Sequence, residues 1–281
     1  MNQIVTRFAP SPTGFLHLGH AYSAFFAWDM ARRSDGRFLL RIEDIDPQRS
    51  RPEFVDAIYE DLAWIGLRWK TPVRRQSMHL RDYIAALAVL SDADMIYPCF
   101  CTRKDIAEEI ARAGIAPQGP DGPIYPGICS NLSTAERGAL IKAGLSYALR
   151  LDIDKAFDRV GPLDFMDYHL GRVDVDPKSI GDIVLARKDV STSYHLSVSV
   201  DDALQGITNV TRGEDLLPAT HIHRLLQALL GLPKPEYHHH RLLSDDEGRR
   251  FAKRDGAKTL RSLRADGQSP AEIRALIGFI N

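Results

Sequence analysis

The sequence predicts an α/β fold in which an insertion separates two halves of a ligand-binding domain. Residues 4–8 form a short β-rich run, which leads through a loop broken by Pro10, Pro12 and Gly14 into a helical pattern. Residues 37–42 have the apolar character of a second, buried strand. Farther along, one segment contains all three cysteines and a loop rich in glycine and proline. A chain of 281 residues can hold one large α/β domain, or a split domain with an insertion.

The composition is that of an ordinary globular protein, with 44% hydrophobic and 26% charged residues. A net charge of −1 provides no global basic field, so any contact with RNA must come from a local patch. The first twenty residues lack the apolar core of a signal peptide, and no apolar run reaches the roughly 18–20 residues that cross a membrane. Three cysteines do not indicate a disulfide scaffold. We therefore expect a cytoplasmic enzyme without a membrane segment.

The first loop carries the strongest chemical pattern, RFAPSPTGFLHLGH at residues 7–20. A strand, a turn and a helix N-terminus form an anion site, because the N–H groups of the first turn point outward. His17 and His20 add side-chain donors, and Gly19 lets a base or phosphate approach the backbone closely. This arrangement suits stabilisation of charge during attack on an α-phosphate. In the alternative interpretation, the two histidines only complete a turn.

The second strand ends at a cluster of carboxylates, Glu43, Asp44 and Asp46. The carboxyl end of a parallel strand lies where open α/β sheets bind ligands. For Asp44 and Asp46, however, a solvated acidic turn is the favoured interpretation. Amphipathic helices are expected over residues 52–66 and 80–90.

Residues 97–190 are predicted to form the insertion. A charged helix is expected over 102–113, then a glycine- and proline-rich loop over 114–127. A capping box at 133–136 predicts a helix that ends near residue 144, and 147–153 alternates like a half-exposed strand. Three thiolates are one ligand short of a closed tetrahedral zinc site. The alternative is that they are small buried hydrophobic side chains; they are Cys99, Cys101 and Cys129.

The rest of the chain is predicted to contain the second half of the domain, residues 191–247, and a basic loop with a terminal helix, residues 248–281. An apolar helix is expected over 220–230, and a capping box with proline at the first helical position starts the last helix at Ser269. The run of three histidines from His238 does not indicate metal, since neighbouring residues of a strand face opposite sides.

The pattern RFAPSPTG followed by HLGH resembles the opening signature of the glutamyl-tRNA synthetase family. The segments RIEDID at 41–46 and STSYHL at 191–196 resemble the same family, as does the stretch up to residue 216. RFAKRDGA at 250–257 is similar to its second ATP signature, K-L-S-K-R followed by H-G-A, although arginine replaces the first lysine and alanine the serine. A solvated basic loop is the alternative there. The resemblance implies a Rossmann-like class I synthetase nucleotide-binding domain with an inserted zinc-containing subdomain.

The resemblance also implies which residues act. Glu43 would hold the ammonium group of glutamate, Arg7 its side-chain carboxylate and Arg212 its α-carboxylate, although the two arginines could be exchanged. Mg²⁺ would accompany ATP. The implied ATP-binding residues are His17, Gly19, His20 and Lys253, of which His17, His20 and Lys253 are catalytic. The implied substrate-binding residues are Arg7, Phe8, Ala9, Pro10, Ser11, Glu43, Tyr194 and Arg212.

Full-length members of that family continue into a helical domain that reads the anticodon, and we expect this chain of 281 residues to have no room for it. With Tyr125 four residues before Cys129, the sequence resembles the subfamily that attaches glutamate to queuosine in the anticodon loop of tRNA(Asp). In that subfamily the tyrosine belongs to the zinc site, which would be structural. A monomer is expected.

Three other functions stay open from the sequence. They are a catalytic fragment that charges a tRNA 3′ end, a non-catalytic RNA-binding paralogue, and a small-molecule nucleotidyltransferase. The long insertion and the implied glutamate site argue against the nucleotidyltransferase, and intact His17, His20 and Lys253 argue against the paralogue.

Overall fold

Helices and strands alternate along the computed structural model, which describes residues 3–113, 118–119, 122–176, 179–243 and 258–279. The helices are α1 Leu18–Arg33, α2 Pro52–Trp64, α3 Leu80–Asp92, α4 Arg103–Ala113, α5 Thr134–Lys142, α6 Ile153–Val160, α7 Tyr194–Leu204, α8 Leu217–Leu229, α9 Leu260–Ala265 and α10 Pro270–Leu276. The strands are β1 Val5–Phe8, β2 Arg37–Ile42, β3 Lys70–Arg75, β4 Ile96–Cys99, β5 Gln118–Gly119, β6 Gly122–Pro123, β7 Ala148–Leu151, β8 Asp164–Asp167, β9 Gly171–Asp174, β10 Val184–Ala186, β11 Asn209–Gly213 and β12 Glu236–His240.

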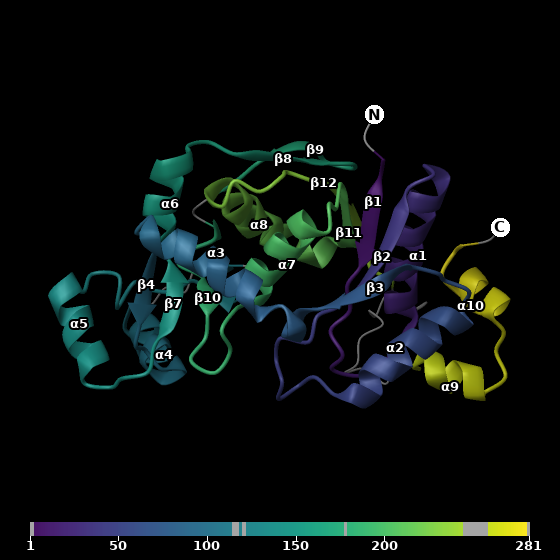
Figure 1. Ribbon diagram of the computed structural model, residues 1–281, viewed down its shortest axis with the longest axis horizontal. Coiled ribbons are helices and arrows are strands. Elements are labelled where there is room, and N and C mark those ends of the chain that lie inside the picture. The colour runs from purple at the N-terminus through teal and green to yellow at the C-terminus, as the bar shows by residue number, and fades with distance from the viewer. Residues whose placement is uncertain (1–2, 114–117, 120–121, 177–178, 244–257, 280–281) are drawn as a thin grey trace.

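The centre of the molecule is a parallel arrangement assembled from two distant parts of the chain. Strands β1, β2 and β3 pair in parallel in that order, and β11, β12 and β8 form a second parallel set with β9 antiparallel at its edge. The two sets meet at β1 and β11, where the Thr208 N–H donates to the Val5 carbonyl at 3.0 Å. Figure 1 shows β1 and β11 side by side. The strand order reverses at this point, which is where open α/β sheets bind ligands.

Successive side chains of β1 point to opposite faces of the sheet, so they pack into two different layers of the fold. Thr6 and Phe8 face α1, and the Thr6 hydroxyl donates to the Ala27 carbonyl at 2.7 Å. Val5 belongs to the other core, which includes apolar side chains of α7 and α8, and Arg7 points to that same side. The helices therefore cover both faces of the sheet, and the charged side chain of Arg7 lies under α7.

Several predicted elements are confirmed. Helix α1 ends at Arg33, and Gly36 follows where a Cβ atom would lie 2.3 Å from the Ile4 carbonyl oxygen, so a side chain cannot fit there. The helices predicted over 52–66 and 80–90 are α2 and α3. The helix predicted over 220–230 is α8, and the capping box at Ser269 starts α10.

The segment predicted as an insertion contains an antiparallel sheet in the order β10-β7-β4. This sheet lies with α4 and α5 at one end of the molecule, far from α9 and α10 in Figure 1. The capping box at 133–136 is confirmed. The strand predicted over 147–153 is shorter, because Asp152 accepts a hydrogen bond from the Lys155 N–H and caps α6. Strand β8 also lies within residues 97–190, yet it pairs with β12.

The prediction that Asp44 lies in a solvated turn was wrong. Its side chain is buried, and its carboxylate accepts hydrogen bonds from the Ser77 N–H at 2.9 Å and from Arg75 Nη2 at 2.9 Å. Arg75 ends β3 and supplies the charge that permits this burial, a contact between neighbouring strands that local sequence does not reveal. Asp46 accepts hydrogen bonds from the backbone of Gln48 and Arg49, as a turn residue does.

Within the described ranges, no helix combines the length and apolar character that crossing a bilayer requires.

Candidate active site

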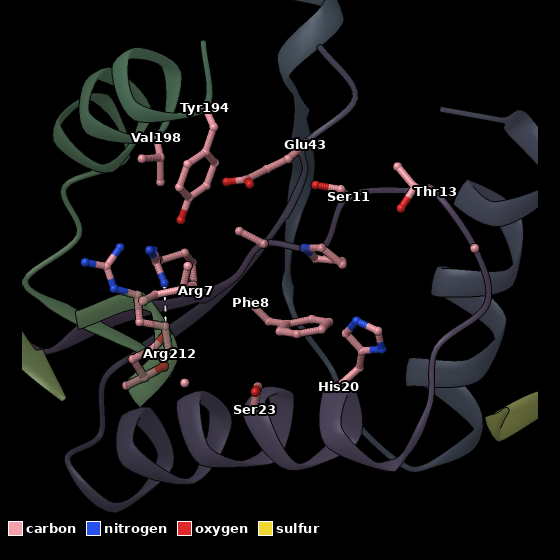
Figure 2. A pocket seen from close by; sticks show the side chains of 16 residues that line it. Arg7, Phe8, Ser11, Thr13, His20, Ser23, Glu43, Tyr194, Val198 and Arg212 are labelled. Atoms are coloured by element: carbon pink, nitrogen blue, oxygen red, sulfur yellow. Dashed lines mark hydrogen bonds between the residues drawn. The ribbon is translucent and has the colours of Figure 1, made fainter. Parts of the chain in front are cut away.

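A cavity of about 350 Å³ opens at the carboxyl ends of β1 and β11, where the two parallel sets of strands meet. Figure 2 shows its lining, with α1 along one side and the loop after β1 along another. The structure brings together at this cavity all the residues that were predicted to bind the amino acid: Arg7, Phe8, Ala9, Pro10, Ser11, Glu43, Tyr194 and Arg212. His20 lines the same cavity.

Two positive groups and one negative group face the cavity. Arg7 and Arg212 lie side by side, and the Tyr194 hydroxyl points between them and the Glu43 carboxylate (Figure 2). All three charged residues are buried, with 5–7% of their surface exposed. Burial raises the pKa of Glu43 despite the opposing charge of Arg41, and burial raises the pKa of Tyr194, which keeps its hydroxyl a hydrogen-bond donor. The cavity therefore has the donors and charges to bind a small dicarboxylate that carries an ammonium group.

Arg7 is paired with a carboxylate behind it. Its Nε and Nη2 atoms donate to the two oxygens of Asp202 at 2.9 and 3.2 Å, and Nη1 donates to the Thr211 carbonyl at 3.1 Å. Arg41 joins the same network: its Nη1 lies 2.7 Å from Asp202 and its Nη2 lies 3.0 Å from Glu43. Burial opposes ionisation of Asp202, but Arg7 and Arg41 hold its pKa below the usual range.

The sequence analysis did not identify Arg41 or Asp202. An arginine in the middle of an apolar strand is a signal that a buried partner exists, because a buried charge must be paired. The sequence gives no indication of which residue the partner is.

Arg212 has a different environment, since its partners are neutral. Nε donates to His239 Nε2 at 3.2 Å, Nη1 lies 3.0 Å from His223 Nδ1, and Nη2 donates to the Thr220 hydroxyl. Among the described residues, no carboxylate forms an ion pair with Arg212. Burial, together with the charge of Arg212, lowers the pKa of His239 to about 4. Arg212 thus presents a full positive charge to the cavity, and its three supporting residues were also missed from sequence.

The two histidines of the first loop cap the helix that follows them. His17 Nδ1 accepts from the Gly19 N–H at 3.1 Å, and His20 Nδ1 accepts from the His17 N–H at 3.2 Å. The expectation that these backbone N–H groups point outward toward an anion was therefore wrong for Gly19, whose N–H is capped. A neutral ring that accepts at Nδ1 carries its hydrogen on Nε2, so each histidine also has an Nε2–H group of donor character.

A second cavity of about 350 Å³ adjoins the first and shares Ser11, Thr13, Glu43 and Tyr194 with it. Its remaining wall comes from the turn after β2, from Gln76 directly after β3 and from the segment before α7, and includes Asp46, Arg49, Arg187 and Thr192. A molecule bound there would contact the same Glu43 and Tyr194 that face the first cavity.

The cysteines form a separate cluster at the start of the insertion. The sulfur atoms of Cys99, Cys101 and Cys129 all lie within 4.8 Å of one another, and in the described part of the chain this is the one group of His, Cys, Asp or Glu that has a metal-ligand arrangement. Tyr125 Oη lies 3.4 Å from both Cys99 Sγ and Cys101 Sγ. In a tetrahedral zinc site, thiolate sulfur atoms lie about 2.3 Å from the ion. The ligand atoms are then about 3.5–3.8 Å from one another. The residues present therefore fit zinc.

The fold and the cavity are those of an α/β domain with a ligand site where its two parallel sets of strands meet, and comparison with known proteins assigns its family. Residues 3–279 match the model of the family described as tRNA synthetases class I (E and Q), catalytic domain. The chain belongs to this family and is a ligase of the aminoacyl-tRNA synthetase type. Residue Lys253 and the second ATP signature lie outside the described residues.

The relatives divide into two named groups. The chain is 51% identical to the glutamyl-Q tRNA(Asp) synthetase of Rhodobacter capsulatus, over 98% of this chain and 100% of that protein. It is 37% identical to the glutamate–tRNA ligase of Aquifex aeolicus, over 97% of this chain but only 56% of that protein. A crystal structure of a glutamate tRNA ligase from Elizabethkingia meningosepticum in complex with its amino acid has a TM-score of 0.76 at 30% identity, covering 91% of this chain and 53% of that one. The chain thus spans about half the length of that solved ligase.

Proposed function

We propose that this enzyme activates glutamate with ATP and transfers the glutamyl group to queuosine in the anticodon loop of tRNA(Asp). The observation that carries the first part is the charge pattern of the cavity, two arginines facing one glutamate side chain. The second part is supported by the names of the relatives, among them the glutamyl-Q tRNA(Asp) synthetases of Rhodobacter capsulatus and Nocardia farcinica, at 51% and 44% identity.

In the proposed complex, Glu43 holds the ammonium group of glutamate and the arginines hold its two carboxylates. Ser11 and the Tyr194 hydroxyl add hydrogen bonds from the wall of the cavity. Glutamine would leave one arginine facing a neutral amide, which forfeits a charge-assisted pair. The enzyme should therefore discriminate against glutamine by charge.

In the first step, an oxygen of the substrate α-carboxylate attacks the α-phosphorus of ATP. A new P–O bond forms, the bond to the pyrophosphate oxygen breaks, and pyrophosphate leaves with that electron pair. The Nε2–H groups of His17 and His20 would donate to phosphate oxygens as negative charge shifts, and Lys253 would meet them as a point charge. Gly19 leaves room for the nucleotide to approach α1. Mg²⁺ would enter with ATP as part of the substrate.

In the second step, a hydroxyl of the queuosine cyclopentenediol attacks the carbonyl carbon of glutamyl-adenylate. An ester bond forms, the acyl–phosphate bond breaks, and AMP leaves while the hydroxyl proton passes to solvent. The second cavity adjoins the amino-acid cavity through Glu43 and Tyr194, and so offers a place from which the acceptor can reach the carbonyl. An unstacked base of a loop has the reach that such an approach requires.

We also propose that Cys99, Cys101, Cys129 and Tyr125 hold a structural zinc ion. They join strand β4 to the loop before α5, so the ion would fix the fold of the segment 97–190, which we propose as the insertion between the domain halves 1–96 and 191–247. The remaining segment, 248–281, would carry the second ATP signature and the terminal helices.

The experiment that tests the function is incubation of the enzyme with ATP, labelled glutamate and total tRNA, followed by identification of the labelled nucleotide. Label on queuosine supports the proposal. Label on the terminal adenosine of tRNA(Glu) would instead support the second candidate, a glutamyl-tRNA synthetase catalytic domain. That candidate is favoured by the 37–39% identity to glutamate–tRNA ligases of which the chain covers 56–60%.

A further inference from the structure

The two arginines of the cavity are held by chemically different partners. Asp202 holds Arg7 with a full negative charge, whereas the side chains that hold Arg212 are a hydroxyl and two imidazoles. An arginine against a carboxylate has its charge compensated before any ligand arrives. Arg212 has three of its N–H groups fixed by neutral acceptors, and its charge is left for a ligand.

His239 is the best fixed of these neutral partners. Its Nδ1 lies 2.7 Å from Asp167 Oδ2, and its backbone N–H donates to the same oxygen at 3.2 Å. Asp167 ends β8 and also accepts from the backbone N–H groups of His169 and Leu170, at 2.9 and 3.0 Å. Asp167 is 1% exposed, and its position is therefore fixed by four hydrogen bonds at a turn of the sheet.

The contact with Asp167 decides which ring nitrogen of His239 accepts. Because the Asp167 carboxylate can only accept, Nδ1 of a neutral His239 must donate to it, which leaves the Nε2 lone pair for Arg212 Nε–H. Thr220 completes the arrangement: its hydroxyl accepts from Arg212 Nη2 and donates its own hydrogen to His239 Nε2 at 2.9 Å, so this nitrogen accepts from both side chains. The carboxylate thus acts on Arg212 through an imidazole rather than directly.

We propose that His239, oriented by Asp167, is a positioning residue that aims the uncompensated guanidinium of Arg212 at a carboxylate of the amino-acid substrate. The inference rests on the proposed function, in which the cavity binds glutamate. By this inference, strands β12 and β8 affect the affinity for the substrate although neither strand lines the cavity.

The test uses two substitutions, each of which keeps one of the two hydrogen-bonding functions of the imidazole ring. His239→Gln places an amide oxygen near the position of Nε2 and retains the acceptor for Arg212. His239→Asn places an amide nitrogen near the position of Nδ1, which retains the donor to Asp167 and removes the acceptor. In glutamate-dependent ATP–pyrophosphate exchange, we expect His239→Asn to raise the KM for glutamate about 10-fold or more, the scale of a lost hydrogen bond to a charged group. We expect His239→Gln to raise the KM for glutamate less than about 3-fold. The KM for ATP should stay unchanged in both variants.

The matched control is His238, the neighbouring residue on the same strand, whose side chain packs on Phe26 and bonds His169 on the opposite face. His238→Asn should leave the KM for glutamate unchanged. If His239→Asn does not fold, Thr220→Val against Thr220→Ser tests the same support of Arg212, with valine expected to raise the KM.

Equal effects of His239→Gln and His239→Asn, or a fall in kcat with an unchanged KM, would overturn the positioning role while leaving glutamate activation standing. A wild-type enzyme that neither binds nor activates glutamate would overturn the proposed function, and the inference with it.

Discussion

Arg41 shows how the site depends on single buried charges. The side chain is fully buried within an apolar strand, and Glu43, Asp201 and Asp202 all lie within ion-pair distance of it. Burial opposes its charge, but these carboxylates outweigh burial and raise the pKa of Arg41 above its usual value. Arg41 therefore stays charged at every accessible pH, and it separates carboxylates that would otherwise repel one another.

Replacing Arg41 with methionine should consequently destabilise the fold by about 3–5 kcal/mol, because it leaves uncompensated buried carboxylates. Urea unfolding gives this number directly. Arg32→Met is the control, since Arg32 is exposed and its ion pair with Asp29 should contribute about 1 kcal/mol or less. A loss below about 1 kcal/mol for Arg41→Met would show that the carboxylates rearrange or become protonated at little cost.

Asp61 is a buried carboxylate that, unlike the carboxylates around Arg41, has no close hydrogen-bond donor among the described residues. It is fully buried on α2, and neither carboxylate oxygen has a hydrogen-bond partner within the described ranges, although Arg264 of α9 lies 3.7 Å away. Burial raises the pKa of Asp61 to about 6. A folded-state pKa above the unfolded value means that this group stabilises the fold in acid, and that the stabilisation is lost as pH rises through about 6.

Asp61→Asn should therefore stabilise the protein at pH 8, by up to about 3 kcal/mol, and progressively less as the pH falls toward 4. Urea unfolding at several pH values measures this, with the exposed Asp56→Asn on the same helix as control. A stability difference that does not change with pH would contradict the raised pKa.

At the scale of elements, the cysteine cluster links strand β4 to the loop before α5. Tyr125 Oη accepts from the Cys129 N–H at 2.8 Å, so the phenol oxygen and the three sulfur atoms are already gathered around one point. A tyrosine ligand would be anionic when bound, and a divalent cation provides the attraction that such a phenolate needs.

Purified protein should accordingly contain about one zinc per chain, and Cys129→Ser should lose most of it. Tyr125→Phe should retain more zinc than Cys129→Ser, because three thiolates remain. Elemental analysis of fresh protein measures both. A zinc content well under half an equivalent per chain in the wild type would contradict the zinc proposal. Equal losses of zinc in the two variants would mean that Tyr125 contributes as much to zinc retention as Cys129 does.

Elements are also the scale at which the sequence predicts best. The strand, loop and helix of residues 4–33 depend on neighbours in sequence and were predicted, although the capping of α1 by His17 and His20 was not. The supports of the site depend on contacts between distant residues: Arg41 meets Asp202 across 161 positions, and Asp167 meets His239 across 72. The first pair depends on how α7 packs over β2 and the second on the pairing of β8 with β12, and neither has a local pattern.

The molecule as a whole has almost no net charge, −1 over 281 residues. Phosphate contacts dominate most binding to nucleic acid, and a near-neutral surface offers few of them. A whole tRNA held by its backbone would need a basic surface of its own, whereas a single loop delivered to the active site would need only local contacts. This balance of charge supports the proposal that the enzyme recognises a single loop of the tRNA.

An isolated anticodon stem-loop that contains queuosine should then accept glutamate, and the same RNA with guanosine at that position should not. Periodate oxidation of the cyclopentenediol should abolish labelling, since it destroys the attacking hydroxyl. Transfer of labelled glutamate to each RNA, followed by nucleoside analysis, gives the result. Equal labelling of the guanosine RNA would exclude queuosine as the acceptor.

The meeting of β1 and β11 has a consequence for synthesis of the chain. Arg7 is translated early, yet the carbonyl that it contacts belongs to Thr211, 204 residues later. While the ribosome makes the intervening residues, β1 can pair with β2 on one edge only, and its other edge waits for β11. An open strand edge on a nascent chain invites pairing with other chains. The cavity at the ends of β1 and β11 therefore cannot form until β11 has been synthesised, and the free edge of β1 is exposed until then.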